Sequence, residues 1–364
     1  MDDTLHLTPH PLPKKMKILA IDIGAGTQDI LLFDSQKNIE NCISLVLPTP
    51  SKLFAEKLKT IESHLYIHGD TIGGGSLGRA IARHIHKGYR VVMEESAAYS
   101  IRNDLDEVKS MGIEVGEKPE ATHFEEIEIQ EVNLWVFERF FSNFGEDLRV
   151  NVIAIAVQDH GVSPKGVSDR SFRFENMERM IRKDNRPETF HFLEDSIPEY
   201  CLRMRSAVAR VKRTSSVPVL VMDTCFSAIL GCLEEVTRPS LVVNVGNGHT
   251  VAALLLERKI EALYEHHTHE LTPKKLENDL RLLIRGELSG RKVFEENGHG
   301  AFTLKPYHGE VSVIVTGPNR HLFKETSFQY IYAAPGGNTM MTGPMGLVKA
   351  AQYWINTESQ ALRA

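Results

Sequence analysis

Short apolar runs alternate with amphipathic segments along most of the chain. A nearly continuous apolar run such as Asn151–Gln158 is typical of a strand in a sheet covered on both faces, whereas apolar residues at helical spacing predict helices. The alternation of the two predicts an α/β fold. The expected strands are Lys17–Ile23, Thr27–Asp34, Ile39–Leu47, Leu65–His68, Tyr89–Met93, Asn151–Gln158, Val217–Met222, Leu241–Val245, Thr250–Leu256, Ile260–Tyr264, Val311–Thr316 and Tyr330–Ala333.

Helices are expected between these strands. Ser51 is the predicted N-cap of the first, Gly112 ends the third, and Thr272 with Pro273 begins another. The charged stretch Pro164–Ser216 predicts two helices with loops. The remaining expected helices, with the first and the third, are Ser51–Glu62, Leu77–His86, Glu95–Met111, Val132–Phe144, Cys225–Glu235 and Pro344–Trp354.

The strongest feature is an internal repeat. Ile21–Gln28 (IDIGAGTQ) and Val243–Thr250 (VNVGNGHT) share the order apolar, Asp or Asn, apolar, Gly, any residue, Gly, polar, polar, and each joins two predicted strands. The glycines let a turn expose successive backbone N–H groups, and such a concavity binds phosphate oxygens. A carboxylate at the strand end can hold Mg²⁺. Two such turns facing each other can hold the phosphates of a nucleotide.

At these residues the chain resembles the actin-like ATPase superfamily, which includes actin, sugar and carboxylate kinases and heat-shock chaperone ATPases. Asp22 to Thr27 resembles the phosphate-1 motif and Gly246 to Thr250 resembles phosphate-2. The resemblance implies two closely packed connecting helices, with Ala228 and Gly231 in one and Gly343, Gly346 and Ala350 in the other, and an adenosine segment at 313–317. The residues that it places at the nucleotide are Gly24, Gly26, Thr27, Gln28, Gly246, Asn247, Gly248, His249, Thr250 and Gly317, with Asp22 and Asn244 at the metal.

More narrowly, four phrases resemble one family of that superfamily, often labelled "putative pyruvate formate-lyase activating enzyme". They are Gly73-Gly74-Gly75, Gln158–Gly161, Glu265–Thr268 and Gly298–Gly300, and the resemblance covers nearly the whole chain from Lys17. A radical-generating activase needs a three-cysteine cluster. The four cysteines of this chain lack that spacing, so a radical iron–sulfur activase is not expected.

Two positions depart from the superfamily pattern. Asn244 stands where phosphate-2 normally carries Asp, so one carboxylate for metal or water is missing. The adenosine segment ends Thr316-Gly317-Pro318 rather than in a double glycine, which affects the placement of the adenine.

The segment Gly73–Gly78 supports other interpretations. It satisfies G-x-G-x-x-G after a strand and before a helix, and Glu94 and Glu95 follow at the spacing of a dinucleotide fingerprint. Gly74-x-Ser76-x-Gly78 also matches a nucleophile elbow. The alternative without a functional role is a glycine loop that leads into a helix.

Several polar residues are candidates that the sequence leaves open. Asp159 and Asp223 each follow an apolar strand, where either could be a general base or a helix cap. A metal site would need converging imidazoles, and the alternative is polar histidines in loops near the cleft. The histidines concerned are His160, His266, His267, His269 and His299.

Composition and charge narrow the class of protein. The chain has 364 residues, which fits two domains. Its net charge of −6 argues weakly against nucleic-acid and anionic-membrane partners. The N-terminus lacks the features of a signal peptide and no apolar stretch is long enough to span a bilayer. A cytoplasmic protein is expected.

We therefore expect duplicated ribonuclease-H-like domains around a central nucleotide cleft. The expected parts are a loose leader (1–15), a first domain with insertions (16–235), a second domain (236–341) and a closing helix and tail (342–364).

The expected function is ATP and Mg²⁺ binding with phosphoryl transfer to an unknown small-molecule or protein acceptor, or slow hydrolysis. Asp22 would orient Mg²⁺, the glycine turns would hold the β- and γ-phosphates, and Asp223 would position the attacking oxygen. The alternatives are a nucleotide-binding sensor or scaffold without turnover and an NAD(P)-binding oxidoreductase that uses Gly73–Gly78.

Overall fold

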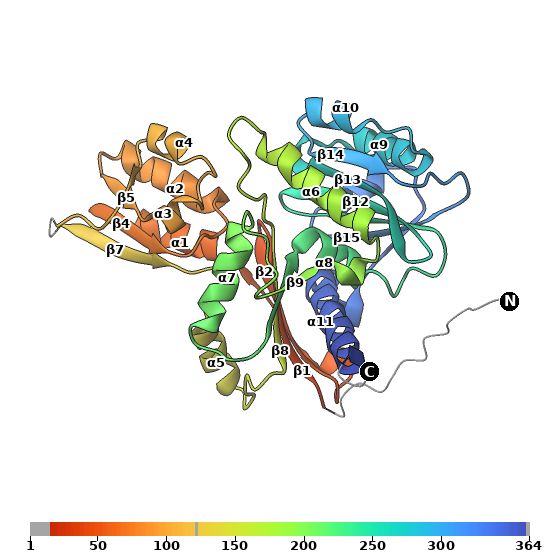
Figure 1. Cartoon of the computed structure of the whole chain (residues 1–364), viewed down its shortest axis with the longest axis horizontal. Helices are drawn as coiled ribbons and strands as arrows, with labels where there is room; N and C mark the ends of the chain where they lie inside the picture. Colours follow the sequence, from red (N-terminus) through yellow and green to blue (C-terminus); the bar gives the residue numbers. More distant parts are fainter. Residues whose placement is uncertain (1–14, 121–122, 362–364) are drawn as a thin grey trace.

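The computed structural model describes residues 15–120 and 123–361, so most of the predicted leader lies outside the described residues. The strands form two six-stranded sheets and one four-stranded sheet. Figure 1 shows the four-stranded sheet at the left, the first six-stranded sheet at the centre and the second at the right.

The first six-stranded sheet combines antiparallel and parallel strands. β1 pairs antiparallel with β2, β2 pairs antiparallel with β3, and β1 pairs parallel with β8, which pairs parallel with β10. Short β9 adds an antiparallel edge strand. In spatial order the strands are β3 (Ile43–Pro48), β2 (Thr27–Asp34), β1 (Lys17–Ile23), β8 (Val152–Val157), β10 (Val219–Asp223) and β9 (His191–Leu193).

The second six-stranded sheet repeats this arrangement. β11 pairs antiparallel with β12, β12 pairs antiparallel with β13, and β11 pairs parallel with β15, which pairs parallel with β16. Apart from the edge strands β9 and β14, both sheets have the strand order of the ribonuclease-H-like fold, which confirms the predicted duplication. In spatial order the strands are β14 (Gly300–Thr303), β13 (Lys259–His267), β12 (His249–Leu256), β11 (Ser240–Val245), β15 (Ser312–Thr316) and β16 (Tyr330–Tyr332).

The repeated sequence motifs form matching hairpins. The N–H of Gly24 donates to the carbonyl of Thr27 at 3.0 Å, and the N–H of Gly246 donates to the carbonyl of His249 at 2.9 Å. The hairpin registers match as well, since residue 22 lies opposite residue 29 and residue 244 lies opposite residue 251. The internal repeat is therefore a structural repeat.

The third sheet belongs to a subdomain inserted between β3 and β8. It is parallel throughout, and α2 connects β4 to β5. Its strands in spatial order are β6 (Glu114–Val115), β5 (Val91–Met93), β4 (His64–Gly69) and β7 (Phe124–Ile129), and its helices are α1 (Pro50–Lys59), α2 (Gly75–His86), α3 (Glu95–Ala98) and α4 (Leu105–Ser110).

Three local predictions were wrong in this part of the chain. The expected helix Glu95–Met111 is two helices, because Asp104 interrupts it and caps α4 by accepting from the N–H of Asp106. The N-cap of α1 is Thr49, whose side chain accepts from Lys52, whereas the Ser51 hydroxyl accepts from the N–H of Leu77 in α2. The strand expected at Ile39–Leu47 begins only at Ile43.

Helices cover both faces of the first sheet. Residues of β1 alternate between the two sides, so that Ile18 and Ala20 pack in a core with α8 and α11 while Leu19 and Ile21 pack in a core with α5 and α7. The first of these cores continues into the second sheet through Val242. The helices are α5 (Leu134–Ser142), α7 (Leu202–Lys212), α8 (Thr224–Gly231) and α11 (Thr342–Ala361).

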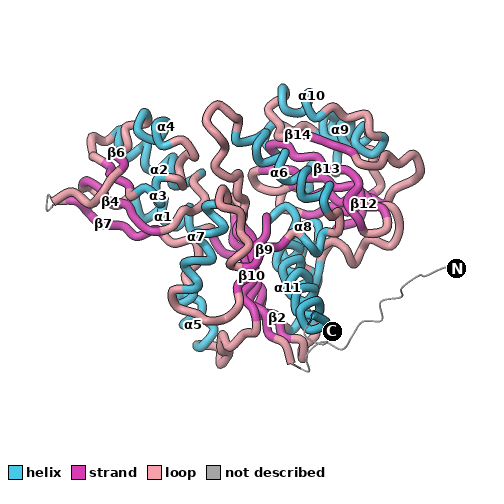
Figure 2. The backbone as a smooth tube through the Cα atoms, in the orientation of Figure 1, coloured by secondary structure: helices cyan, strands magenta, loops and turns pink. Residues whose placement is uncertain are grey.

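The second sheet is covered by α9 (Pro273–Arg285), capped at Thr272 as predicted, and by α10 (Gly290–Glu295). On the other side lies α6 (Asp169–Lys183), whose Phe174 packs edge-on against Phe302. Figure 2 shows α6 over the second sheet, although its sequence belongs to the predicted first domain. The domain boundaries at 235 and 341 remain predictions.

Helices α8 and α11 cross closely between the two sheets. A Cβ on Gly231 would lie 1.8 Å from the carbonyl oxygen of Thr342, and a Cβ on Gly346 would lie 1.8 Å from that of Ser227. The hydroxyl of Ser227 donates to the carbonyl of Gly343 at 2.5 Å. The small residues singled out in the sequence thus allow this crossing. Among the described helices, none combines the length and apolar character needed to cross a bilayer.

Candidate functional site

The two glycine turns face each other across a narrow cleft. They are in contact, because a Cβ on Gly26 would lie 2.0 Å from the side-chain nitrogen of Asn247, and a Cβ on Gly248 would lie 3.3 Å from Cβ of Ala25. A side chain at Gly26 would displace the side chain of Asn247, and one at Gly248 would crowd Ala25. Of the residues predicted at the nucleotide or metal, those lining this cleft are Asp22, Gly24, Thr27, Asn244, Gly246, Asn247, Gly248, His249 and Gly317, and Gly26 lines an adjoining cleft.

Two predicted contacts point elsewhere. The side chain of Gln28 donates to the carbonyl of Pro48 at 2.9 Å, and the hydroxyl of Thr250 bonds that of Thr268 at 3.1 Å. Both residues are buried and neither lines the cleft. Because side chains alternate along a strand, Thr27 and His249 face the cleft while their neighbours do not.

Asp22 has a buried partner that the sequence analysis missed. Asp29 lies directly opposite it across the β1–β2 hairpin, and both side chains line the cleft. Burial raises the pKa of Asp22 to about 7, although Thr224 donates to it at 2.6 Å. Burial and the charge of Asp22 raise the pKa of Asp29 to about 8. Counting residues back across the glycine turn would have revealed this acidic pair.

The second hairpin has no such pair. Asn244 occupies the position of Asp22, and its cross-strand neighbour is Val251. Next to it, Gly317 has a φ of +93°, and a Cβ there would lie 2.6 Å from Oδ1 of Asn244. The departure noted at Thr316-Gly317-Pro318 therefore still provides a glycine where one is needed. The carboxylates of the cleft all come from the first repeat.

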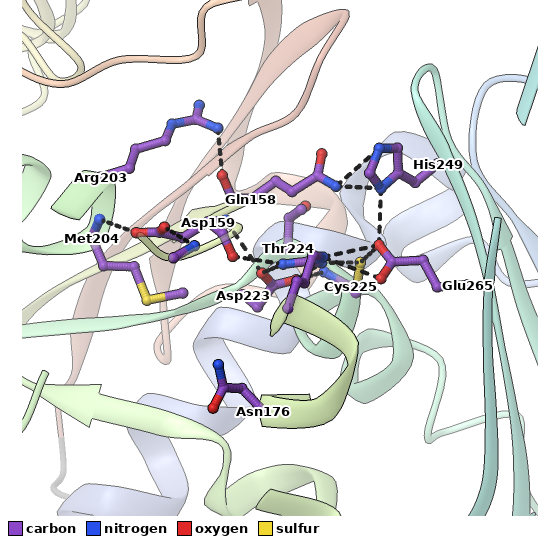
Figure 3. A network of polar contacts seen from close by, with 12 residues as sticks. Gln158, Asp159, Asn176, Arg203, Met204, Asp223, Thr224, Cys225, His249 and Glu265 are labelled. Carbon is purple, nitrogen blue, oxygen red and sulfur yellow. Dashed lines mark hydrogen bonds and ion pairs between the residues drawn. The ribbon is translucent and has the colours of Figure 1, made fainter. Parts of the chain in front are cut away.

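Asp223 belongs to a buried ionic network (Figure 3). Arg173 donates to both oxygens of Asp223, at 2.6 and 3.0 Å, and its Nε lies 3.1 Å from each oxygen of Glu265. Burial would raise the pKa of both carboxyls, but the charge of Arg173 outweighs it and holds both values below the ordinary range. The network therefore contains one buried cation and two buried anions.

Asp159 also has structural partners. Its two oxygens accept backbone N–H groups from Gly161 at 2.8 Å and from Met204 at 3.0 Å. Asp159 and Asp223 thus already accept hydrogen bonds on both oxygens, whereas Oδ1 of Asp29 has no hydrogen-bond partner among the described residues. The base role predicted for Asp159 and Asp223 is not favoured by these contacts.

Three of the histidines converge beside the cleft. One ring nitrogen each from His160, His249 and His299 lies within 4.8 Å of the other two. Burial lowers the pKa of His160 to about 3 and that of His299 to about 2. Of the other predicted candidates, His267 lies beside this cluster and His269 is exposed next to Glu270, while Nδ1 of His266 donates to the carbonyl of His267 at 3.1 Å.

The glycine segment 73–78 begins α2 in a βαβ unit, as a dinucleotide fingerprint requires. However, the N–H of Gly73 donates to Glu131 at 3.1 Å, and Arg203 pairs with the same carboxylate at 2.6 Å. A Cβ on Gly74 would lie 1.6 Å from the carbonyl oxygen of Ser100. Packing accounts for this glycine, and the N–H of Gly73 is already bound to a carboxylate of the chain.

A larger cleft of about 990 Å³ adjoins the first. The tips of both glycine turns, including Asn247, line both clefts, and so does Gln158. The larger cleft extends to the inserted subdomain and carries several basic side chains: Lys52, Arg79, Arg102, Arg170 and Arg203.

The duplicated strand order, with facing glycine turns and a close helix crossing between the halves, defines a two-domain protein of the actin-like ATPase fold. A model of the family described as "Putative pyruvate format-lyase activating enzyme (DUF1786)" matches residues 72–322, which is more than half of the chain. The chain belongs to this family. No curated protein matches it.

Several solved structures are similar over most of their length. An inorganic polyphosphate/ATP-glucomannokinase from Arthrobacter sp. strain KM is 14% identical, with 93% of this chain and 99% of that chain covered and a TM-score of 0.34. The ethanolamine utilization protein EutJ from Carboxydothermus hydrogenoformans is 12% identical (94% and 91% covered, TM-score 0.36). MreB5 of Spiroplasma citri, bound to ADP, is 11% identical (94% and 99% covered, TM-score 0.36). The fold assignment itself rests on the strand order.

The cysteines bear on the description of this family as an activating enzyme. Cys42, Cys201, Cys225 and Cys232 are all buried and free. Among the described residues, no three cysteines come together as ligands.

Proposed function

We propose that the chain binds Mg²⁺–ATP between its two glycine turns and transfers or hydrolyses the terminal phosphate. The observation that carries the proposal is the pairing of two structurally equivalent turns tip to tip beside the buried Asp22–Asp29 pair. The tips of the turns lie outside the strand ladders, so their N–H groups are in position to face phosphate oxygens.

The acidic pair suits a hard cation. Mg²⁺ is usually held by one or two carboxylates together with water and substrate phosphates. Asp22 accepts from the hydroxyl of Thr224 at 2.6 Å and Asp29 from that of Thr27 at 3.4 Å, and Oδ1 of Asp29 lacks a partner in the part of the chain that the structure describes. Bound there, the cation would neutralise phosphate charge.

Binding requires the halves to separate. The contact between Gly26 and Asn247 fills the position where phosphates would lie. The α8–α11 crossing joins the two sheets and is the natural hinge for this motion. Reclosure over the nucleotide would exclude water from the cleft.

The acceptor would enter from the larger cleft, which meets the first at the turn tips. Five basic side chains line it against three carboxylates, and this excess of positive charge favours an acceptor that carries negative charge, either a small molecule or a protein segment.

The experiment is a thermal-shift titration with Mg²⁺–ATP. We expect stabilisation of the wild type that requires Mg²⁺ and is lost in Asp22→Asn and Asp29→Asn, while Asp106→Asn, an exposed control in α4, behaves as the wild type. No shift, or a shift unchanged in both cleft variants, would refute the proposal. The same titration with NAD(P) tests the alternative in which Gly73–Gly78 binds a dinucleotide.

Asn244 supports a second candidate, a nucleotide-binding sensor or scaffold without turnover, because the second hairpin carries no carboxylate to position water. Measuring the rate of ADP release by the wild type and by Asn244→Asp distinguishes an enzyme from a sensor without turnover. A measurable wild-type rate that rises in Asn244→Asp supports a weakened enzyme. Binding without ADP release in either protein supports the sensor.

A further inference from the structure

The three converging histidines come from different parts of the fold. His160 lies in the loop after β8, His249 begins β12, and His299 immediately precedes β14. The ring centroids of His249 and His299 are 4.5 Å apart, and His160 lies 5.6 and 5.7 Å from them. One histidine therefore comes from the first half of the molecule and two from the second.

His299 provides the second observation. It is 2% exposed, and neither ring nitrogen has a hydrogen-bond partner among the described residues. A buried imidazole normally satisfies at least one nitrogen, because leaving a buried polar atom unpaired is costly. A ligand that accepts a lone pair from His299 would remove this cost.

Glu265 orients His249 as a carboxylate orients a metal-bound histidine. It accepts from Nδ1 of His249 at 2.9 Å and is itself held by Arg173. Such a bond fixes the tautomer and leaves Nε2 with a free lone pair. The amide nitrogen of Gln158 contacts Nδ1 of this ring most closely and lies 3.3 Å from Nε2 (Figure 3). With the amide turned over, its oxygen accepts from the same Nδ1–H as Glu265 does.

The charge balance favours a cation at this place. Arg173 carries one positive charge between the carboxylates of Asp223 and Glu265, which leaves one net negative charge buried beside the imidazoles.

We propose that His160, His249 and His299 bind a divalent transition-metal ion of the zinc type, at a site separate from the Mg²⁺–ATP site. Tetrahedral zinc with Zn–N bonds of about 2.0–2.1 Å places its nitrogen ligands about 3.4 Å apart. The observed limit of 4.8 Å requires only small side-chain movements. Three histidines with an open fourth position are typical of zinc sites that also bind water or substrate.

The position of the site indicates what the fourth ligand contacts. His249 lines the small cleft and His160 lines the larger one. The open position therefore lies at the junction of the two clefts, where it can take an oxygen of water or of an anionic ligand. Because the histidines come from both halves, the ion also favours the closed arrangement of the molecule.

The test uses protein treated with EDTA, without nucleotide or Mg²⁺, titrated with Co²⁺ and Zn²⁺. We expect one equivalent of Co²⁺ to give the visible absorption of a tetrahedral site and one equivalent of Zn²⁺ to displace it. His160→Ala and His299→Ala should each weaken binding at least about 100-fold, whereas His86→Ala, an exposed histidine of α2, should bind as the wild type does.

Two further measurements keep the test decisive. The unfolding temperature of the wild type should rise on Zn²⁺ addition and that of His160→Ala should not, which holds even if His299→Ala folds poorly. Asp22→Asn should retain the transition metal, so that failure of Mg²⁺–ATP binding and failure of this site are distinguishable. Binding of less than one equivalent by the wild type, or binding by both histidine variants that is as tight as that of the wild type, would overturn the proposal.

Discussion

The buried pair Asp22 and Asp29 makes the stability of the metal-free protein depend on pH. Their folded-state pKa values, raised by burial to about 7 and about 8, exceed the ordinary Asp value of 3.8. A raised pKa means that the stabilising contribution is present below the unfolded pKa and is lost as pH rises through the folded pKa. Stability should therefore fall between about pH 4 and about pH 8.

The magnitude follows from the size of the shifts. One pKa unit corresponds to about 1.4 kcal/mol, so shifts of roughly three and four units cost about 4 and 6 kcal/mol when both groups are ionised. The charge of Asp22 contributes to the raised pKa of Asp29, so part of the second figure is present only when both groups are ionised. We expect a loss of at least about 4 kcal/mol across the window.

Asp29→Asn tests the reasoning because it removes one charge and keeps the shape. At about pH 8, in EDTA, it should be more stable than the wild type by about 3 kcal/mol, and the difference should vanish near pH 4. Urea unfolding at a series of pH values measures both, with the exposed Asp106→Asn as control. The reasoning would be refuted by a wild-type stability that stays constant over this range, or by an Asp29→Asn variant that is no more stable than the wild type at pH 8. Either result would show that the buried charges of the pair are neutralised by other groups.

Two further predictions concern the frame around the site. Gly346→Ala places a Cβ 1.8 Å from a backbone oxygen of α8 and should lower the free energy of unfolding by about 1–3 kcal/mol or more. The control Gly78→Ala lies in α2, where the nearest atom to the added Cβ is 3.8 Å away, and should be neutral or stabilising. Thermal unfolding compares the two variants, and equal losses of stability would contradict the close crossing of α8 and α11. Arg173→Met leaves two buried carboxylates without their cation and should cost about 3–5 kcal/mol in urea unfolding. The exposed Arg291→Met should change stability by no more than about 0.5 kcal/mol, and a similarly small effect for Arg173 would exclude the ionic network as a stabilising feature.

The sequence was informative where a short segment sets its own conformation. The glycine turns, the strands beside them and the Thr272 cap follow from local rules, and the structure has them at the expected positions. Local rules failed where a side chain makes its hydrogen bond to a distant part of the chain. The Ser51 hydroxyl bonds α2 instead of capping α1, and β7 was missed because its acidic side chains mask its apolar ones.

The candidate site shows the same division. Repetition in the sequence identified both turns and Asp22, because a repeated motif needs no knowledge of long-range contacts. Asp29 was within reach by counting across the hairpin. The convergence of His160 with His249 and His299, and the pairing of Arg173 with Glu265, join positions far apart in the chain.

By itself, the sequence determined the class of fold and the duplication and predicted phosphate binding at the turns, because hydrophobic period and glycine position act over a few residues. Only the tertiary structure decided which carboxylates pair with Arg173, which acids already accept hydrogen bonds from structural partners, and which histidines lie close together. Those outcomes depend on burial and on distances between elements, and both are set by how the two sheets pack around α8 and α11.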